Sequence, residues 1–530
     1  MVKTLVVFEF KDEIDAFISQ RSIDELRHEN VRVLALMPES QVYLKQLQIP
    51  FFNTCGFFCK EGHEHVLLQS DRICRFMESF LRIEDNLGVK EGYKNSFLYY
   101  TRLFAHYVLW LIEVIERCCK ELCITKLICF SKANRHITEP VLSITEGYLG
   151  EIGARIANKL NIEFESFNGP KIVQYLVYKK FKKCAAEVVK YLIYQIKLRF
   201  LKFQTRHNKI ILTTSRSYNL GRVLDKFKQA FNNAYVIYLN NIYSNQRGSY
   251  LKKLLSAMFD EVIQLPKVGA SNKKKFIETI NDTILKIKDN KESNDVFAYR
   301  GITFSDLVLN KIKNDIIPVL CEIRSQTEHL DSFFKKYPPT IIISQMSRDI
   351  NYNLGELASF YEIPSLLISH GSHIPPANEY EMIEWSEHGL GLISTDYQFI
   401  ALQSPWAKAH IEKIPVRSKQ VVTGPLLFAR IERNQSKKEL LRKNIIPGHE
   451  DKIVLVHADT PRIRSDLRFY VYQTVDEYIS SLNSLIKAVE GIKDMYLIIR
   501  FRPKYFLTKK HLINLLNKSH CYSICREGTF

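Results

Sequence analysis

Short apolar runs alternate with longer helical patterns along nearly the whole chain, and no other feature of the sequence limits the fold as strongly. Residues 4–10 form the first apolar run, residues 12–29 have helical periodicity, and residues 31–37 form the next run. Further apolar runs occupy residues 125–130, 161–166, 209–214, 234–239, 261–265, 340–344, 365–369, 399–403, 420–423, 452–457, 496–500 and 520–525. Strands that are separated by helices pair in parallel, so the sequence predicts the α/β class with doubly wound, Rossmann-type parallel sheets.

The length of 530 residues corresponds to about three domains. We expect a Rossmann-like α/β domain over residues 1–205, a second over 206–430 and a third over 431–530. The third holds only half of the strands that a doubly wound domain needs, and we expect it to be incomplete. Residues 267–293 are rich in lysine and asparagine and are expected to form a mobile excursion.

The formal net charge of +18 favours anionic partners: phosphate-bearing donors, nucleic acid or an acidic membrane surface. Residues 171–209 contain eleven lysines and arginines against one acid, Glu187, with apolar residues interleaved. Two interpretations are open for this segment: a basic amphipathic helix at an anionic membrane, or a linker helix whose apolar side packs on its own domains. No recognised nucleic-acid module accompanies the charge, so we expect no nucleic-acid partner.

Cysteine usage and the apolar stretches indicate the compartment. The 11 cysteines lie mostly inside apolar runs, which is typical of reduced, buried thiols. The N-terminus lacks the layout of a secretory signal, and the most apolar stretch, residues 103–115, is shorter than the roughly 20 residues that span a bilayer. We therefore expect a cytoplasmic protein, peripheral to the inner face of the cytoplasmic membrane.

Two strand ends carry similar polar clusters. Ser215 and Arg216 follow one predicted strand and precede Tyr-Asn-Leu-Gly, while Ser347, Arg348 and Asp349 follow another strand and precede the same four residues. Ligands bind at the carboxyl edge of parallel sheets, which makes these residues candidates for the acceptor side of a site. Repeated helix N-cap chemistry is the competing interpretation, since Ser, Asp and Asn are good caps.

A histidine-rich strand end is the strongest local pattern. The apolar run 363–369 leads into His370, Gly371, Ser372 and His373. A histidine at the carboxyl rim of a sheet can act as a general base near neutral pH, and the glycine lets the backbone approach a ligand. The alternative is a histidine that caps the strand or bonds to the backbone. Further on, the run 420–423 leads into Gly424, the start of a Gly-Pro turn that suits a hinge between two lobes.

Polar and cationic residues also follow two strands of the third block. The run 452–457 leads into His457, Asp459, Thr460 and Arg462. The run 496–500 leads into Arg500, Arg502 and Lys504. Guanidinium groups match phosphate oxygens, so these residues are candidates for binding the phosphates of a nucleotide donor. Ordinary surface cations remain the alternative.

These segments, over roughly residues 335–505, resemble the GT-B glycosyltransferases of surface-polysaccharide and lipopolysaccharide synthesis and the related CDP-glycerol glycerophosphotransferases. The resemblance is carried by Ser369-His370-Gly371, by Thr423-Gly424-Pro425 and by Arg500-Phe501-Arg502-Pro503. It implies a GT-B-like pair of Rossmann-type domains, preceded here by an additional N-terminal α/β domain. It also implies that His370 is the base or binds the acceptor, and that the turn from Arg500 to Lys504 faces the donor phosphates.

The chain departs from that family where its pattern has a histidine before the proline, because Arg502 stands there and cannot exchange a proton near neutral pH. The Ser/Thr-rich turn and the Glu-containing helix expected further on are not present before Phe530. A zinc site at Cys55, Cys59, His63 and His65 is a weak alternative because the spacing matches no common finger. Phosphate-loop, dinucleotide-loop and nucleophile-elbow motifs are missing from the sequence.

The leading hypothesis is a metal-independent transferase without a cofactor. It would move a sugar or polyol phosphate from a nucleotide-sugar or CDP-polyol, used as co-substrate, to a lipid-linked or polysaccharide acceptor. Two alternatives stay open: a nucleotide-sugar 2-epimerase-like enzyme, and a non-catalytic scaffold of a polysaccharide assembly complex.

Overall fold

The computed structural model describes most of the chain. The described residues are 3–83, 88–132, 148–168, 187–199, 201, 209–214, 218–230, 233–239, 262–267, 273–368, 374–393, 395–414, 416–424, 435–459, 475–501 and 513–524.

Four parallel strands form the N-terminal sheet, in the order β2-β1-β3-β4. They are β1 (Thr4–Phe8), β2 (Val31–Ala35), β3 (Lys126–Lys132) and β4 (Glu163–Asn168). The accompanying helices are α1 (Lys11–Gln20), η1 (Ile23–Arg27), α2 (Pro38–Gln46), η2 (Thr54–Gly56) and α5 (Tyr148–Leu160). The central strands β1 and β3 consist mainly of buried apolar residues, because helices cover both faces of such a sheet. The four strands predicted from the sequence in this part are confirmed.

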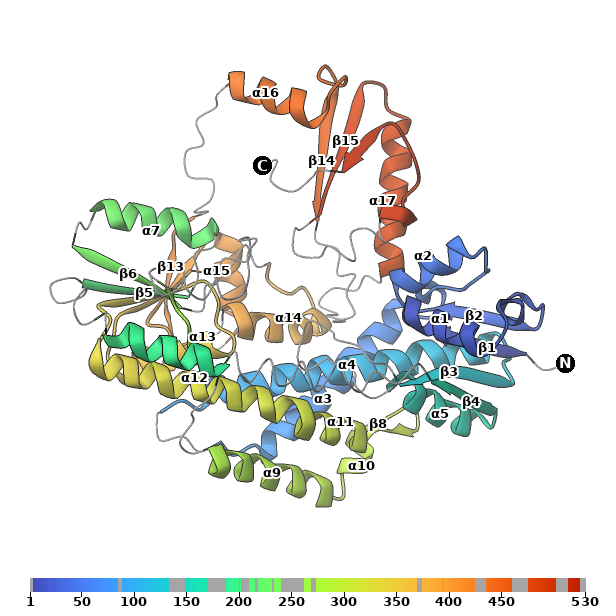
Figure 1. Cartoon of the computed structure of the whole chain (residues 1–530), viewed down its shortest axis with the longest axis horizontal. Helices are drawn as coiled ribbons and strands as arrows, with labels where there is room; N and C mark the ends of the chain where they lie inside the picture. Colours follow the sequence, from blue (N-terminus) through green and yellow to red (C-terminus); the bar gives the residue numbers. More distant parts are fainter. Residues whose placement is uncertain are drawn as a thin grey trace.

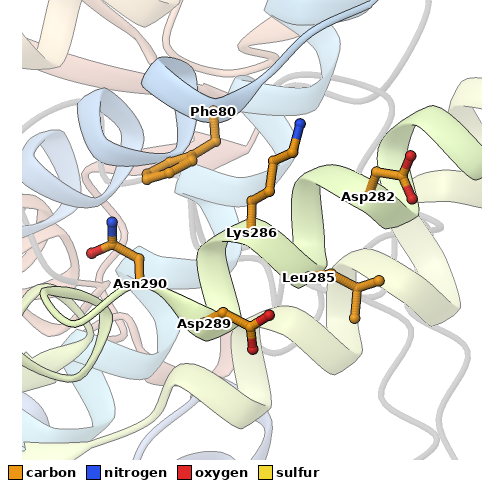
Figure 2. A pocket seen from close by; sticks show the side chains of 6 residues that line it. All are labelled: Phe80, Asp282, Leu285, Lys286, Asp289 and Asn290. Carbon is orange, nitrogen blue, oxygen red and sulfur yellow. The ribbon is translucent and has the colours of Figure 1, made fainter.

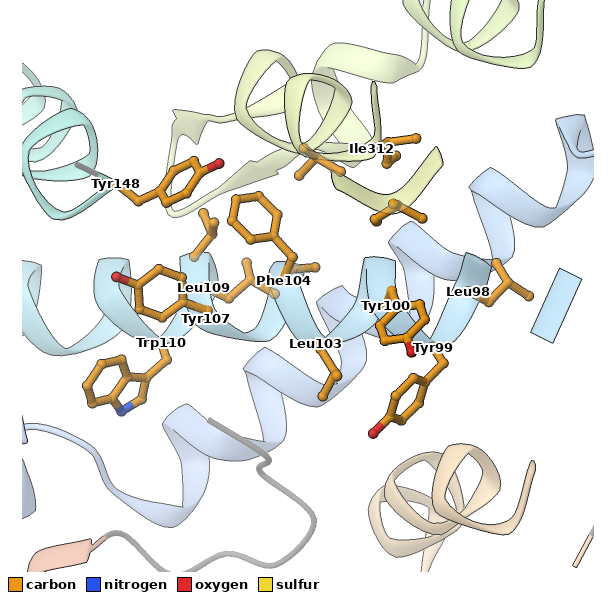
Figure 3. Packing of buried hydrophobic residues seen from close by; sticks show 14 of the residues in the cluster. Leu98, Tyr99, Tyr100, Leu103, Phe104, Tyr107, Leu109, Trp110, Tyr148 and Ile312 are labelled. Atoms are coloured by element: carbon orange, nitrogen blue, oxygen red, sulfur yellow. The ribbon is translucent and has the colours of Figure 1, made fainter. Parts of the chain in front are cut away.

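Two long helices, α3 (Lys60–Phe80) and α4 (Glu91–Glu121), lie between β2 and β3 in the chain. Every residue of α4 from Ser96 to Glu116 is buried, and Figure 3 shows Phe104, Tyr107 and Trp110 projecting from different sides of it. A helix that carries large apolar side chains on all its sides must be enclosed by other elements. It packs on α3, on α5 and on α13 (Ile350–Phe360), a helix of the second sheet. In Figure 1, α4 runs horizontally through the middle of the molecule, between the two larger sheets.

Two fully buried carboxylates on α4 hold a small hairpin, β8 (Ala298–Tyr299) and β9 (Ile302–Thr303). Arg300 Nε lies 2.6 Å from Glu113 Oε2, and the Tyr299 hydroxyl donates to the same oxygen at 2.8 Å. Glu116 pairs with Lys120 at 2.7 Å and also with Lys159. The hairpin is therefore attached to α4 by charge as well as by packing.

Seven parallel strands form the central sheet, in the order β13-β12-β11-β10-β5-β6-β7. They are β5 (Lys209–Thr213), β6 (Ala234–Leu239), β7 (Val262–Ile263), β10 (Ile341–Ser344), β11 (Ser365–Ile368), β12 (Phe399–Leu402) and β13 (Lys419–Val422). The helices of this part, besides α13, are α7 (Tyr218–Ala230), α9 (Lys273–Asp289), α10 (Ser293–Val296), α11 (Ser305–Lys311), the π-helical turn η4 (Ile312–Ile316), α12 (Ile317–Lys336), α14 (Glu379–Leu392) and α15 (Pro405–Ile411). All seven strands were predicted from the sequence.

The prediction of a mobile excursion over residues 267–293 is wrong for residues 273–289, which form α9. Phe276, Ile280 and Ile287 are buried on one side of this helix, at a spacing that matches helical periodicity. Lysines occupy several of its other positions. Because the prediction relied on composition, it overlooked this apolar stripe. The predicted boundary at residue 205 stays a prediction, and one continuous apolar core includes residues on both sides of it.

Three parallel strands form the last sheet, in the order β14-β15-β16. They are β14 (Ile453–Asp459), β15 (Met495–Phe501) and β16 (Tyr522–Ile524), accompanied by α16 (Gln435–Ile445) and α17 (Val475–Glu490). The sheet has its own apolar cluster, in which Leu482 and Ile486 of α17 pack on Leu497 and Ile499. The α/β class with parallel sheets is thus confirmed in all three parts. None of the helices within the described ranges is both long and apolar enough to cross a bilayer.

Candidate functional site

The chain order of the central sheet reverses between β5 and β10. β5 comes first in sequence, β6 and β7 lie on one side of it, and β10 to β13 lie on the other. In doubly wound sheets, the carboxyl ends of two strands at such a reversal are separated by a crevice where ligands bind. The cluster of Ser215 and Arg216 follows β5, and the cluster of Ser347 to Asp349 follows β10. The topology therefore makes the two strand ends that precede these clusters neighbours in the sheet. Ser215 and Arg216 themselves lie outside the described residues.

Polar side chains meet at this reversal point. Thr214 Oγ1 and Ser344 Oγ are 3.0 Å apart, and the Ser344 hydroxyl donates to the Met346 carbonyl at 2.7 Å. Because a serine has one hydroxyl hydrogen, Ser344 accepts from Thr214, which places a short chain of hydrogen bonds across the two strand ends. The sequence analysis missed both residues. The available signal was a hydroxyl-bearing residue at the last position of two apolar strands.

The loop after β10 is held by α4. The Arg348 guanidinium carbon lies 3.9 Å from the centre of the Tyr99 ring, within the range of a cation–π contact. The Tyr100 hydroxyl donates to Asp349 Oδ2 at 2.9 Å, and Ser347 is buried. The described contacts of Arg348 and Asp349 therefore attach this loop to α4, and an acceptor-side role for them stays a prediction.

The backbone at Asp349 is strained. Its φ of 53° and ψ of −130° place a non-glycine residue in a region that favours glycine, at the N-cap of α13. Such a conformation costs about 1–3 kcal/mol and occurs preferentially at functional sites. Burial raises the pKa of the Asp349 carboxyl, although Arg348 and the Tyr100 hydroxyl oppose this effect. A strained acid with a buried carboxyl oxygen at the carboxyl edge of a sheet makes this loop the best-supported part of the candidate site.

A second buried acid connects α13 to α4. Glu356 Oε1 accepts from the backbone N–H groups of Lys90 and Glu91 at 3.0 Å each, and Oε2 accepts from that of Gly92 at 2.9 Å. The carboxyl group thus caps the first turn of α4, where unpaired N–H groups accumulate. Burial raises the pKa of Glu356 to about 7, against the opposing effect of these three hydrogen bonds. Nothing in the local sequence predicts this contact.

The histidine-containing strand end falls outside the described residues, since His370, Gly371, Ser372 and His373 are not among them. Its flanks are described. β11 ends at Ile368, and on the other side His410 Nδ1 of α15 lies 2.8 Å from the Ile374 carbonyl. Lys413 donates to the Pro376 carbonyl at 3.0 Å. The described flanks therefore lie at the carboxyl end of β11, beside β10, and against α15.

Gly424 follows β13 with a φ of +75°, and a side chain there would meet no atom within 4 Å. The glycine is needed for the turn conformation rather than for close packing. The Gly-Pro turn continues into residues outside the described ranges, so the hinge and a role for Gly424 in donor binding stay predictions.

The phosphate candidates of the third block lie on neighbouring strands. In the β14–β15 pair, His457 is opposite Ile499, Ala458 is opposite Arg500, and Asp459 is opposite Phe501. Because facing residues of a sheet share a face and successive residues alternate, His457 and Arg500 lie on opposite faces near the carboxyl edge. The His457 ring is 6.5 Å from that of Tyr478 on α17, whereas Arg500 is exposed. Only a ligand at the edge itself could contact both.

Four further phosphate candidates, Thr460, Arg462, Arg502 and Lys504, lie outside the described residues. Within the described part of the chain, no group of three or more His, Cys, Asp or Glu side chains could hold a metal ion. In that part, the Cys59 sulfur of the weak zinc alternative accepts a hydrogen bond from Arg117 at 2.8 Å.

An open groove lies away from these strand ends, on α9 and the end of α3 (Figure 2). It has a volume of about 550 Å³, and its lining residues are Phe80, Asp282, Leu285, Lys286, Asp289 and Asn290. The sequence analysis singled out none of them. Its charges are mixed in sign, so the lining favours no particular ligand class.

Comparison with protein-family models and with curated proteins gives no match. Solved structures with partial similarity include the MnaA protein of S. aureus with UDP, at 8% identity and a TM-score of 0.31, covering 60% of this chain and 68% of that one. The UDP-GlcNAc 2-epimerase of Neisseria meningitidis bound to UDP-GlcNAc gives 14% identity and 0.31, covering 60% and 73%. The UDP-N-acetylglucosamine 2-epimerase from Rickettsia bellii gives 13% and 0.32, covering 60% and 69%. Scores this low support no functional conclusion.

Proposed function

We propose that this chain is a glycosyltransferase that acts without a bound metal or cofactor. It moves a sugar or polyol phosphate from a nucleotide-activated donor to a lipid-linked or polysaccharide acceptor. The observation that carries the proposal is the chain reversal between β5 and β10, where Thr214 and Ser344 meet and the strained loop at Asp349 begins. A crevice of this type is the usual ligand site of a doubly wound sheet.

The chemistry assigned to this site is direct displacement. For a sugar donor, the acceptor hydroxyl oxygen forms a bond to the anomeric carbon, and the bond from that carbon to the diphosphate oxygen breaks. The imidazole of His370 takes the hydroxyl proton, and the nucleoside diphosphate leaves with the electron pair. Cations such as Arg500, Arg502 and Lys504 would stabilise the developing negative charge on the phosphates.

The acceptor and donor sides are assigned to different sheets. Ser347, Arg348 and the segment of His370 to His373 would surround the acceptor at the central sheet. The carboxyl edge of β14 and β15 would receive the donor phosphates. The proposal includes a location at the inner face of the cytoplasmic membrane, which suits a lipid-linked acceptor.

The experiment measures transfer from a panel of nucleotide-sugars and CDP-polyols that a thermal-shift screen has first shown to bind. His370→Ala is expected to abolish transfer and to leave donor binding and the thermal midpoint unchanged. His65→Ala, at an exposed position of α3, is the matched control and should retain full transfer. Transfer by the His370 variant at the rate of the unmodified protein would remove His370 from the mechanism.

The same assay separates the two alternatives. A nucleotide-sugar 2-epimerase would convert the donor in the absence of any acceptor, so product formation without acceptor would favour it. A non-catalytic scaffold would bind the donor without converting it under any condition. Dependence of donor consumption on the acceptor is the result that our proposal requires.

A further inference from the structure

Residues 187–199 form a helix with an apolar stripe on its outer side. Val188, Leu192 and Ile196 follow one another at four-residue spacing, and their exposed fractions are 55%, 55% and 39%. Residues four apart lie on one face of a helix, so these three form a continuous row. Val189 and Tyr191 are also exposed and widen it. We refer to the five residues as the outward stripe.

The opposite side of this helix is fixed to the protein. The Tyr194 hydroxyl donates to the His329 carbonyl at 2.7 Å, and the Tyr337 hydroxyl donates to the Leu198 carbonyl at 2.6 Å. At the start of the helix, Glu187 accepts from the backbone N–H of Lys267 at 3.0 Å. The helix cannot rotate to bury the outward stripe without breaking these contacts.

Both sequence interpretations of this segment therefore have a counterpart on the helix. Tyr194 and Leu198 pack on the protein's own core, as the linker interpretation requires. The outward stripe remains uncovered by the described residues.

Positive charge accompanies the stripe. Arg199 is exposed on the same helix, three residues after Ile196, and Lys190 is half-buried between the stripe residues and pairs with Glu187. Along the sequence, residues 171–209 contain eleven cations and one acid. An apolar row beside an exposed arginine, on a chain with a formal net charge of +18, fits the interface of a bilayer that contains anionic lipid.

We propose that the outward stripe docks this protein on an anionic membrane surface. A second copy of the chain fits less well, because a stable dimer buries roughly 800 Å² on each partner, far more than five partly exposed side chains on one helix offer. Membrane docking needs only a few inserted apolar side chains with cations beside them.

The test is sedimentation of the full chain with phosphatidylcholine vesicles, with and without phosphatidylglycerol. The unmodified protein should bind the anionic vesicles, and the binding should weaken as salt is added. Leu192→Glu should lower the vesicle affinity roughly tenfold, because it replaces a half-exposed leucine by an anion. Leu285→Glu on α9 is the matched control, because Leu285 is also 55% exposed but lies on another surface, and its affinity should not change.

Several outcomes would overturn the proposal. They are the absence of vesicle binding, an unchanged affinity for Leu192→Glu, and an equal loss for Leu285→Glu. A self-association that Leu192→Glu abolishes would identify a second copy as the occupant instead. Thermal midpoints establish that each variant is folded, and Leu192→Ser replaces the glutamate variant if the latter unfolds. The inference deepens the membrane location included in the proposed function. Because vesicle binding involves no turnover, a failure to bind vesicles and a failure of transfer are distinguishable.

Discussion

Glu356→Gln tests whether burial or hydrogen bonding to a helix N-terminus determines the ionisation state of a buried carboxyl group. Burial raises the pKa of Glu356 to about 7, whereas a glutamate in an unfolded chain has a pKa of about 4.3. Three backbone N–H groups at the start of α4 favour the ionised form instead. Between these two pH values, the Glu356 carboxyl group stays protonated in the folded protein and is ionised in the unfolded chain.

The sign and size of the effect follow from this difference. A pKa that is raised in the folded state contributes stability that is complete below the unfolded-state pKa and is lost as the pH rises through the folded-state pKa. At 1.36 kcal/mol per pKa unit, Glu356 should cost about 3 kcal/mol of unfolding free energy between pH 4 and pH 7, as an order of magnitude. Glutamine cannot titrate, but its carbonyl oxygen can still accept the hydrogen bonds from Lys90 and Glu91.

The assay is denaturant unfolding of both proteins from about pH 4.5 to about pH 8, followed by helical circular dichroism. Glu356→Gln should gain stability relative to the unmodified protein as the pH rises, by about 3 kcal/mol in total. Glu91→Gln is the matched control: Glu91 lies in the same first turn of α4 with a side chain that is 46% exposed, and its variant should follow the unmodified protein. A constant difference between Glu356→Gln and the unmodified protein at all pH values would refute the reasoning. It would mean that the helix N-terminus keeps this carboxylate ionised.

Two further predictions concern buried charge and backbone strain. Arg300→Met removes the cation that pairs with the fully buried Glu113 and should lower the unfolding free energy by about 3–5 kcal/mol. Thermal unfolding measures both this variant and its control, Arg72→Met. Exposed Arg72 pairs with Asp295, and its loss should cost at most about 1 kcal/mol. Asp349→Gly, made in a background of Tyr100→Phe and Ser96→Ala so that the side-chain hydrogen bonds of the carboxyl group are already absent, should raise stability by about 1 kcal/mol because glycine accepts the positive φ. A loss of stability in that background would show that the carboxylate has a structural role beyond these hydrogen bonds.

The sequence alone determined the class of fold. Strands such as β1 and β5 are five-residue segments with an apolar centre, bounded by helical patterns. Local patterns of this kind follow from which faces must be buried. The same reasoning placed Ser347, Arg348 and Asp349 directly after a strand of the central sheet and His457 and Arg500 on strands of the last one. It failed for α9, because abundant lysines concealed the regular spacing of Phe276, Ile280 and Ile287.

Tertiary structure alone decided how those segments meet. That β5 and β10 are neighbours, so that Thr214 reaches Ser344, depends on a strand order that no local pattern encodes. Glu356 caps a helix that begins 265 positions earlier in the chain, and Arg348 rests on a tyrosine of that same helix. The physical reason is that burial and hydrogen bonding act between groups that are close in space. Sequence patterns report which side of an element is buried, and only the packed chain determines what lies against that side.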